Sequence, residues 1–210
     1  MDTKTAVSAL HRERMLAAAE RVFAEKGFEQ TTVDDLSRAT GYSRRTLYAY
    51  FESKEGVLHA LLAQGLEALA AEMEEAFAAE TAFLKRFDAM AEAIRRYTLR
   101  CAYAAEVIEG ARTDGAGRGT EGEKRIFTAG ERVNGLLCRV VEVGKAEGKV
   151  REDVLSLPAV CVLWEGLLGV VRLTAAKGAY LTRAFSMTEE DFWRYGKAQL
   201  LRGILKEEKR

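Results

Sequence analysis

The stretch Thr31–Leu58, TTVDDLSRATGYSRRTLYAYFESKEGVL, decides the fold of the N-terminal part of this chain. Thr32 is a good N-cap, because its hydroxyl can accept a hydrogen bond from a free backbone amide in the first turn of a short helix. Gly41 ends that helix, and Ser43 immediately caps another short helix, Arg44–Phe51. Two short helices joined by so tight a turn are typical of a helix-turn-helix.

Helices are also predicted on both sides of this stretch. A first helix is expected over about Ala9–Lys26, with Gly27 at its left-handed end, and a fourth, longer helix begins after Ser53. A single proline in 210 residues, with abundant Ala, Leu, Glu, Lys and Arg, favours helix in the remainder. The glycine-rich stretch Gly110–Gly122 is expected to be a flexible loop. Further helices are expected at about 82–109, 123–147, 157–177 and 188–207.

The predicted fold class is therefore all-α. A three-helix helix-turn-helix domain is expected over residues 1–56, and the long fourth helix joins it to a C-terminal helical domain, residues 57–210. No stretch at the boundary is typical of a disordered linker, so we expect the two parts to move together.

The overall charge gives no prior indication of a nucleic-acid partner. The chain carries 32 Lys and Arg against 32 Asp and Glu. Any affinity for DNA must therefore come from where the positive charges lie, not from their excess. The polar N-terminus, and the lack of an apolar run near the ~18 residues that span a membrane, predict a cytoplasmic protein with no membrane partner.

The third helix has two faces of different character. Leu47, Tyr50 and Phe51 share one face on a helical wheel and are expected to pack in the core. The other face can read bases, since arginine can form two hydrogen bonds to guanine, and alanine or the threonine methyl can contact thymine methyls. Hydroxyls, a lysine and free amides at the helix N-termini can hold phosphates. The DNA-binding candidates are Thr32, Ser43, Arg44, Arg45, Thr46, Tyr48, Ala49 and Lys54.

These candidates also have a structural alternative. In isolation, Arg44 and Arg45 would usually be a solvated pair, and Lys54 only a favourable surface charge. They are candidates for DNA contacts because they belong to a helix-turn-helix.

Residues 12–58 resemble the DNA-binding domain of TetR-family regulators. Arg12–Phe28, RERMLAAAERVFAEKGF, is similar to the family's first helix and its glycine–aromatic ending. Further positions that match the family pattern are Thr32, Leu36, Gly41, Ser43, Thr46, Leu47, Tyr48, Phe51, Lys54 and Leu58.

Four positions depart from that pattern. Ser37 and Thr40 stand where alanine is usual, and Tyr42 stands where a small aliphatic residue is usual. Arg45 stands where glycine is frequent and adds a side chain that can read bases. We therefore expect an operator distinct from those of related proteins.

The resemblance implies a function for the whole chain. It implies a homodimer that binds a pseudo-palindromic DNA operator and releases it when a small molecule binds the C-terminal ligand-binding and dimerisation domain. A ligand-responsive transcriptional repressor, released by a small and largely apolar effector, is therefore expected. Effector binding is expected to move the fourth helix and change the separation of the two recognition helices.

The C-terminal helices offer apolar faces for a dimer. Small residues among the apolar ones let helices approach closely, as in the four-helix bundle through which the family dimerises; alternatively, these helices close the chain's own core. The candidate dimer residues are Leu163, Leu167, Val171, Phe192, Gly196, Leu200, Gly203 and Ile204.

Aromatic and methionine side chains of the middle helices are candidates for lining a ligand pocket, with structural core as the alternative for each. Arg95, Arg96 and Arg100 can recognise an anion if one turns inward, and otherwise form a solvated basic face. The pocket candidates are Phe87, Met90, Tyr97, Cys101, Phe127 and Trp164.

No catalytic residue, cofactor or metal site is predicted, and the chain is not expected to be an enzyme. Gly117–Gly122 has the GxGxxG spelling, but a dinucleotide site needs a preceding strand and this stretch follows a helix. His11 and His59 lie outside any zinc spacing, and the three cysteines form no CxxC. A regulator without an effector and an activator stay open within the class of DNA-binding regulators. Two other classes also stay open: a helical small-molecule binding protein without sequence-specific DNA binding, and, weakest, an enzyme or sensor based on Cys101.

Overall fold

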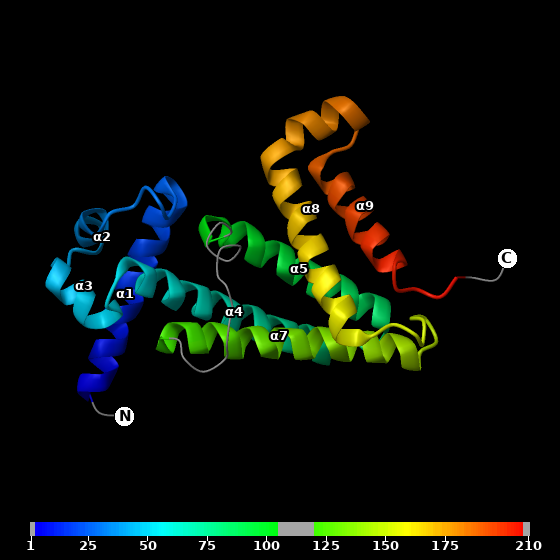
Figure 1. The fold of residues 1–210 in the computed structure, drawn as a ribbon, viewed down its shortest axis with the longest axis horizontal. Coiled ribbons are helices and arrows are strands. Elements are labelled where there is room, and N and C mark those ends of the chain that lie inside the picture. Colours follow the sequence, from blue (N-terminus) through cyan, green and yellow to red (C-terminus); the bar gives the residue numbers. More distant parts are fainter. Residues whose placement is uncertain (1–2, 105–119, 208–210) are drawn as a thin grey trace. The chain divides into compact units, whose positions relative to one another are not determined.

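The computed structural model describes residues 3–104 and 120–207, and every regular element within these ranges is a helix. The predicted all-α fold class is confirmed. An isolated antiparallel bridge joins Val150 to Leu205. The helices, labelled as in Figure 1, are α1 (Thr3–Lys26), α2 (Val33–Thr40), α3 (Arg44–Phe51), α4 (Lys54–Ala79), α5 (Phe83–Arg100), the 3-10 helix η1 (Ala102–Ala104), α7 (Glu121–Ala146), α8 (Ser156–Phe185) and α9 (Glu189–Arg202).

The start of α7 lies inside the stretch that was expected to be a loop. Residues 110–119 of that stretch lie outside the described part of the chain. Thr120 and Glu123 form a capping box, in which the Glu123 amide donates to the Thr120 hydroxyl at 3.3 Å and the Glu123 carboxylate accepts the Thr120 amide at 2.6 Å. Gly122 is therefore part of a helix, because the cap fixes the first turn around it.

Other helix ends also differ from the expectation: α1 begins at Thr3 and not near Ala9, and α9 ends at Arg202 and not near residue 207. The helix expected at about 82–109 ends at Arg100 and is followed by η1. The end expected near residue 177 is an interruption inside α8, where Lys177 leaves the helical dihedrals with φ −131° and ψ 22°.

Contacts divide the chain into two compact units. The N-terminal unit comprises Met1–Gly65 and Cys101–Thr128, and the C-terminal unit comprises Leu66–Arg100 and Ala129–Arg210. Both α4 and α7 begin in the N-terminal unit and continue in the C-terminal one. The domain boundary expected at Gly56 lies earlier in α4 and stays a prediction.

One buried apolar cluster holds the helices of the N-terminal unit together. An isolated helix shorter than about 12–15 residues is marginal in water, so the two eight-residue helices depend on this cluster. Burial of each large side chain contributes about 1.5–3 kcal/mol. Buried members from α1 to α4 include Phe23, Leu36, Leu47, Phe51 and Leu58.

The ends of α1 and α2 are fixed as the sequence predicts. Gly27 and Gly41 both have φ 76°, the left-handed conformation that ends a helix. Thr32 and Asp35 form a capping box, with the Asp35 amide 3.2 Å from the Thr32 hydroxyl. Lys26 lies 2.8 Å from the Asp35 carboxylate. The hydrogen bond from Lys26, followed by those from the Thr32 amide and hydroxyl, holds the pKa of Asp35 well below its usual range.

In the C-terminal unit α8 packs between α5 and α9 (Figure 1). The Trp193 ring of α9 is fully buried, and its Nε1 donates to the Glu92 carboxylate of α5 at 2.6 Å. A Cβ added to Gly166 would lie 2.5 Å from Leu200, and one added to Gly196 would lie 2.7 Å from a Val170 methyl. The close helix approach expected from small residues therefore occurs between α8 and α9 of the same chain.

Burial changes the role of several residues that were expected in a dimer interface. Gly196 and Leu200 lie in the α8–α9 contact, Phe192 is half-buried and Gly203 is exposed. The side chains that are buried inside the protomer's own unit, and so cannot be the surface that a partner meets, are Leu163, Leu167, Val171 and Ile204.

α8 is long and apolar enough by composition to cross a membrane, with a mean hydropathy of 1.6 in its most apolar window. Polar residues such as Glu165 and Arg172 interrupt its apolar positions, so no uninterrupted apolar run marks this helix in the sequence. Within the C-terminal unit, Val160, Leu167 and Val171 bury one face of this helix, as in the core helix of a globular protein.

Gly144→Ala is expected to destabilise the protein by about 1–3 kcal/mol through overpacking. Gly144 is buried in α7, and an added Cβ would lie 2.5 Å from a Val150 methyl and 2.8 Å from the Phe83 ring. Gly135→Ala on the same helix is the control, because its added Cβ meets no other part of the described chain within 4 Å. Urea unfolding measures both, and equal effects would contradict the close packing at Gly144.

The capping box of α2 is expected to make the protein less stable in acid. Asp35 has a lowered pKa in the folded protein, so the unfolded chain binds the proton first as the pH falls below about 4. The stabilisation is complete above that pH and is lost on further acidification. Asp35→Asn is therefore expected to be less stable than the wild type at pH 7, and urea unfolding should show the difference shrinking towards about pH 2. A difference independent of pH would contradict this assignment.

Candidate nucleic-acid interface and ligand cavity

The third helix turns one face inward and the other to solvent, as predicted. Leu47 and Phe51 are buried, whereas Arg45, Tyr48 and Ala49 are exposed. Among residues 3–104 and 120–207, no hydrogen bond or ion pair engages the Arg45 guanidinium. Its five N–H donors are thus available to a base edge or a phosphate.

Arg44, the neighbouring arginine, is engaged with the helix that precedes the turn. Its Nε and Nη2 each donate to one oxygen of the Asp34 carboxylate in the first turn of α2. The two side chains are 62% and 48% exposed, so this two-point ion pair lies at the surface. It was not predicted from the sequence.

The hydroxyls predicted to hold phosphates are used largely within the helix caps. The Thr32 hydroxyl donates to Asp35 at 2.8 Å. The Ser43 hydroxyl accepts the Thr46 amide at 3.2 Å and lies 2.9 Å from the half-buried Thr46 hydroxyl. Backbone amides at the helix N-termini are therefore the stronger candidates for phosphate contacts here.

Lys54 has a structural role that the sequence did not show. Its ammonium donates to the Phe28 carbonyl at 3.0 Å and lies 4.2 Å from the centroid of the Phe28 ring. These contacts fix the start of α4 to the end of α1. The ammonium group retains further donors, but its position is set by the protein.

Three of the four departures from the TetR pattern form one hydrogen-bond network in the turn. The Ser37 hydroxyl donates to the Tyr42 carbonyl at 2.6 Å, and the Thr40 hydroxyl accepts the Tyr42 amide at 3.2 Å. The Tyr42 hydroxyl lies 2.5 Å from His11 Nδ1 on α1. Hydroxyl residues close to a turn often bond to its backbone, and this is the signal that could have identified the network.

An open hollow of about 610 Å³ lies beside the turn. Arg38, which the sequence analysis did not single out, contributes a side chain that is 79% exposed. The residues that line the hollow are Asp34, Ser37, Arg38, Gly41, Tyr42 and Ser43.

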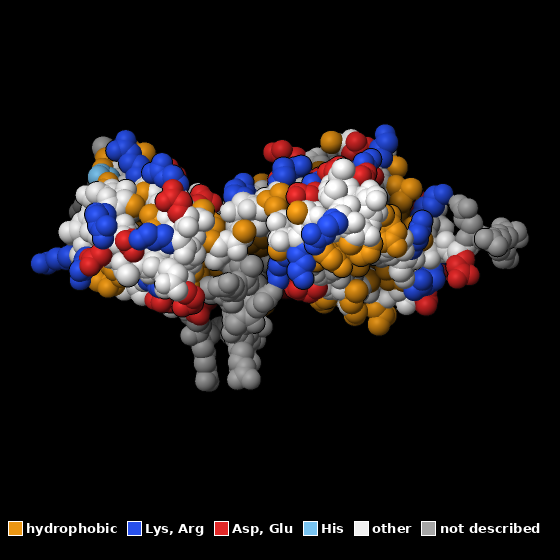
Figure 2. Space-filling view, turned by 90° about the horizontal axis from the view of Figure 1, so that it is seen from above, with side chains coloured by type: hydrophobic (Ala, Val, Ile, Leu, Met, Phe, Trp, Pro, Cys, Tyr) orange, Lys and Arg blue, Asp and Glu red, His pale blue; other side chains and the backbone are white. Residues whose placement is uncertain are grey.

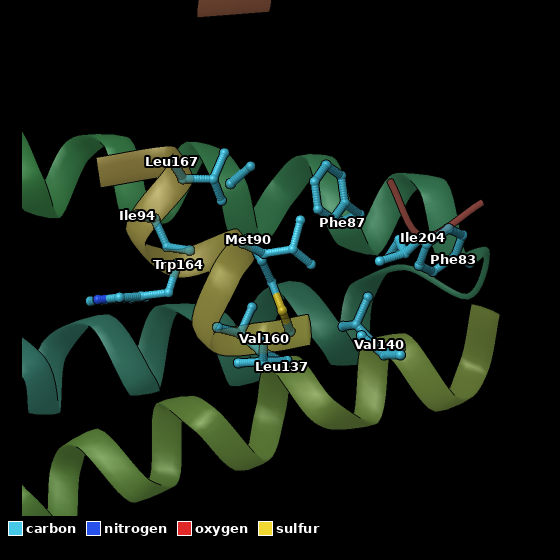
Figure 3. A pocket seen from close by; sticks show the side chains of 13 residues that line it. Phe83, Phe87, Met90, Ile94, Leu137, Val140, Val160, Trp164, Leu167 and Ile204 are labelled. Carbon is cyan, nitrogen blue, oxygen red and sulfur yellow. The ribbon is translucent and has the colours of Figure 1, made fainter. Parts of the chain in front are cut away.

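A small cavity of about 20 Å³ lies in the C-terminal unit, between α5, α7 and α8 (Figure 3). Figure 3 shows the Met90 side chain directed from α5 towards Val160 and Leu137. Three of the predicted pocket residues, Phe87, Met90 and Trp164, line it. All its lining residues are apolar: Phe83, Phe87, Met90, Ala91, Ile94, Leu137, Val140, Val141, Val160, Leu163, Trp164, Leu167 and Ile204.

The other pocket candidates do not line this cavity. Tyr97 is buried beside Trp164, with ring centroids 6.4 Å apart, but is not among the lining residues. Cys101 and Phe127 belong to the N-terminal unit, and Phe127 is 48% exposed. Arg95 and Arg96 face surface carboxylates and do not line the cavity.

Those surface ion pairs involve the first two of the three arginines considered as anion ligands. Arg95 lies 2.6 Å from Glu190, and Arg96 pairs with Glu72. Arg96, 59% exposed, matches the solvated face that was weighed as the alternative, whereas Arg95 is 25% exposed and lies 5.3 Å from the centroid of the Trp193 ring.

Comparison with known sequences identifies the helix-turn-helix. Residues 15–61 match the family described as bacterial regulatory proteins, tetR family. The chain is 48% identical over 48 residues to the HTH-type transcriptional regulator EthR of Mycolicibacterium smegmatis, covering 23% of this chain and 22% of EthR. It is 40% identical over 63 residues to the HTH-type transcriptional repressor ComR of Escherichia coli, covering 30% of each. The chain thus matches less than a third of the length of these curated relatives.

Solved structures extend the likeness to both units. The fatty acid degradation regulator FadR of Bacillus halodurans superposes with a TM-score of 0.71 at 19% identity, over 92% of this chain and 95% of FadR. The TetR family regulator PfmR of Thermus thermophilus gives 0.64 at 25% identity, over 90% and 97%. Residues 15–61 thus form a helix-turn-helix of the tetR type, and the chain shares its overall fold with solved proteins described as TetR family regulators.

Proposed function

We propose that this chain is a repressor that binds a pseudo-palindromic operator as a homodimer and is released by a small, largely apolar effector. The observation that carries the DNA-binding part is the exposed face of α3, where Arg45 is unengaged by any described residue and lies beside Tyr48 and Ala49. A helix that enters the major groove needs such a face. ComR, which is similar to this chain over 63 residues, is described as a repressor, and this supports repression over activation.

Base reading is assigned to Arg45 and Ala49, one helical turn apart. The arginine can bond guanine through two donors, and the alanine methyl can contact a thymine methyl. Tyr48, 46% exposed, is placed to reach a phosphate with its hydroxyl. Free amides at the N-termini of α2 and α3 would hold further phosphates.

The homodimer is assigned to the exposed face of α8. Leu155, Val162 and Gly169 recur every seven residues and therefore share one stripe, and Val162 is 68% exposed. Farther along, Tyr180 and Phe185 are also exposed. Hydrophobic side chains gather on this unit in Figure 2. A two-fold dimer would cover the stripe with its own copy and match a pseudo-palindromic operator.

The chemistry of the cavity supports an apolar effector, since no polar side chain lines it. Drug-sized ligands occupy about 300–1,000 Å³, whereas 20 Å³ holds about one water molecule. An effector would therefore have to separate α5, α7 and α8. FadR of Bacillus subtilis, a structural neighbour with a TM-score of 0.66, was solved in complex with stearoyl-CoA, which carries a long apolar chain.

Coupling to DNA would run through the helices that cross between the units. α7 begins in the N-terminal unit and supplies Leu137 and Val140 to the cavity, and α4 also continues from one unit into the other. Emptying a nearly full operator requires about 5.5 kcal/mol of differential affinity. The effector would therefore have to bind the DNA-incompetent arrangement about 10⁴-fold more tightly.

Replacing Arg45→Ala together with Tyr48→Ala is expected to abolish sequence-specific DNA binding, since one lost two-point base contact alone costs about 1–3 kcal/mol. The operator is first selected from a random DNA pool with the wild type, and affinities are then measured by fluorescence anisotropy at fixed salt. Arg202→Ala, which removes an exposed arginine from the end of α9, is the control and should leave affinity unchanged. Sedimentation checks the dimer. If the double variant binds as well as the wild type, or no sequence is selected, the chain is instead a helical small-molecule binding protein.

Trp164→Ala is expected to change the effector concentration for half-release of the operator by roughly tenfold, because a cavity wall is lost. Effectors are found by screening apolar compounds, stearoyl-CoA among them, for thermal stabilisation. Affinity for DNA without effector should stay the same. Leu99→Ala removes an exposed apolar side chain from α5, a helix that also lines the cavity, and should not shift the release curve. A compound that binds tightly but leaves operator affinity unaltered would contradict effector-driven release.

A further inference from the structure

We infer that Asp34 is a specificity-determining residue of the helix-turn-helix, which holds Arg44 back from DNA and leaves Arg45 as the arginine that reads the operator. The inference rests on the proposed DNA-binding function. Two adjacent arginines at the start of one recognition helix thereby have different roles.

The geometry of the ion pair between Asp34 and Arg44 sets the direction of the arginine side chain. Arg44 donates through both Nε and Nη2 to the two oxygens of one carboxylate, which is the arrangement that best fixes a guanidinium. Asp34 belongs to α2 and Arg44 to α3, so the pair spans the turn. Arg44 is thereby directed towards α2 instead of outward from the tip of α3.

Asp34 is not needed for the helix cap. The capping box of α2 is made by Thr32 and Asp35, and Lys26 neutralises Asp35 at 2.8 Å. The two adjacent carboxylates therefore have separate partners: Asp35 pairs with Lys26 of α1 and, at 3.6 Å, with Arg38 of α2, whereas Asp34 pairs with Arg44 of α3. Removing the charge of Asp34 leaves the box intact.

Asp34 lines the open hollow beside the turn, together with Arg38 and Ser43, and its side chain is 48% exposed. When α3 enters a groove, a carboxylate on this side meets the phosphate backbone. It repels phosphate and cancels the charge of Arg44, which acts against binding to any sequence that Arg45 does not read.

Arg45, unlike Arg44, has its guanidinium free of any described partner. It follows Arg44 directly but is rotated by about 100° around the helix. A guanidinium held in a two-point ion pair has few donors left for a base, whereas an unengaged one retains all five.

Asp34→Asn tests the inference by releasing Arg44. Binding to DNA of unrelated sequence is expected to tighten by up to about fivefold, the range that an exposed ion pair permits. The slope of log affinity against log salt should steepen by about 0.9, as for one more phosphate contact. Operator binding should change less, so the preference for the operator falls. Asp34→Glu, which retains the charge, should restore most of the preference.

A double-mutant cycle separates action through Arg44 from the charge of Asp34 alone. In an Arg44→Ala background, Asp34→Asn should no longer steepen the salt slope. Glu29→Gln removes another exposed carboxylate from the N-terminal unit and should not reproduce the effect. Circular dichroism checks folding.

Three results would overturn the inference while the repressor proposal stands: no change in Asp34→Asn, the same change without Arg44, or the same change in Glu29→Gln. A wild type that selects no DNA sequence would overturn both.

Discussion

The left-handed backbone at Gly41 is the constraint on which the N-terminal unit depends. A Cβ at this position would meet no other described atom within 4 Å, so the requirement for glycine is conformational, with φ at 76°. At this residue α2 ends, and Ser43 can begin α3 after a very short connection. The turn brings Leu36 and Leu47 into one core, and it brings Asp34 within reach of Arg44. A side chain at Gly41 would strain all of these contacts at once, because L-residues other than glycine rarely adopt this conformation.

The sequence predicted correctly those features that depend on interactions between residues close together in the chain. The caps at Thr32 and Ser43 and the left-handed glycines follow from hydrogen bonds between residues close in sequence, so the chain itself specifies them. The two faces of α3 follow from helical periodicity in the same way. The missed cap at Thr120 was also local, since its partner Glu123 stands three residues later in the sequence.

The spacing of apolar residues along a helix does not show whether its apolar face packs inside the same chain or against a second copy. Leu167 and Val171 have the spacing of an interface and are buried in the chain's own core, because both α5 and α9 pack against α8. Pairings between distant residues, such as Lys54 with Phe28, depend on how the helices dock, and residue spacing does not encode them. The same limit applies to the cavity, where Phe87 and Trp164 come together and Phe127 does not.

Charge explains how a chain with zero net charge can present a binding face. The acidic residues of the first turn of α2 favour the helix by facing its positive end, yet a carboxylate near a phosphate opposes DNA binding. Lys26 neutralises the charge of Asp35, and Arg44 neutralises that of Asp34. The helix therefore keeps two acidic residues in its first turn without presenting their negative charge to DNA. The exposed guanidiniums of Arg38 and Arg45 then supply positive charge beside a compensated surface. Affinity for DNA then depends on a few arginine side chains at defined positions and not on an overall basic domain. The preference for one DNA sequence is therefore sensitive to the carboxylate that pairs with each arginine.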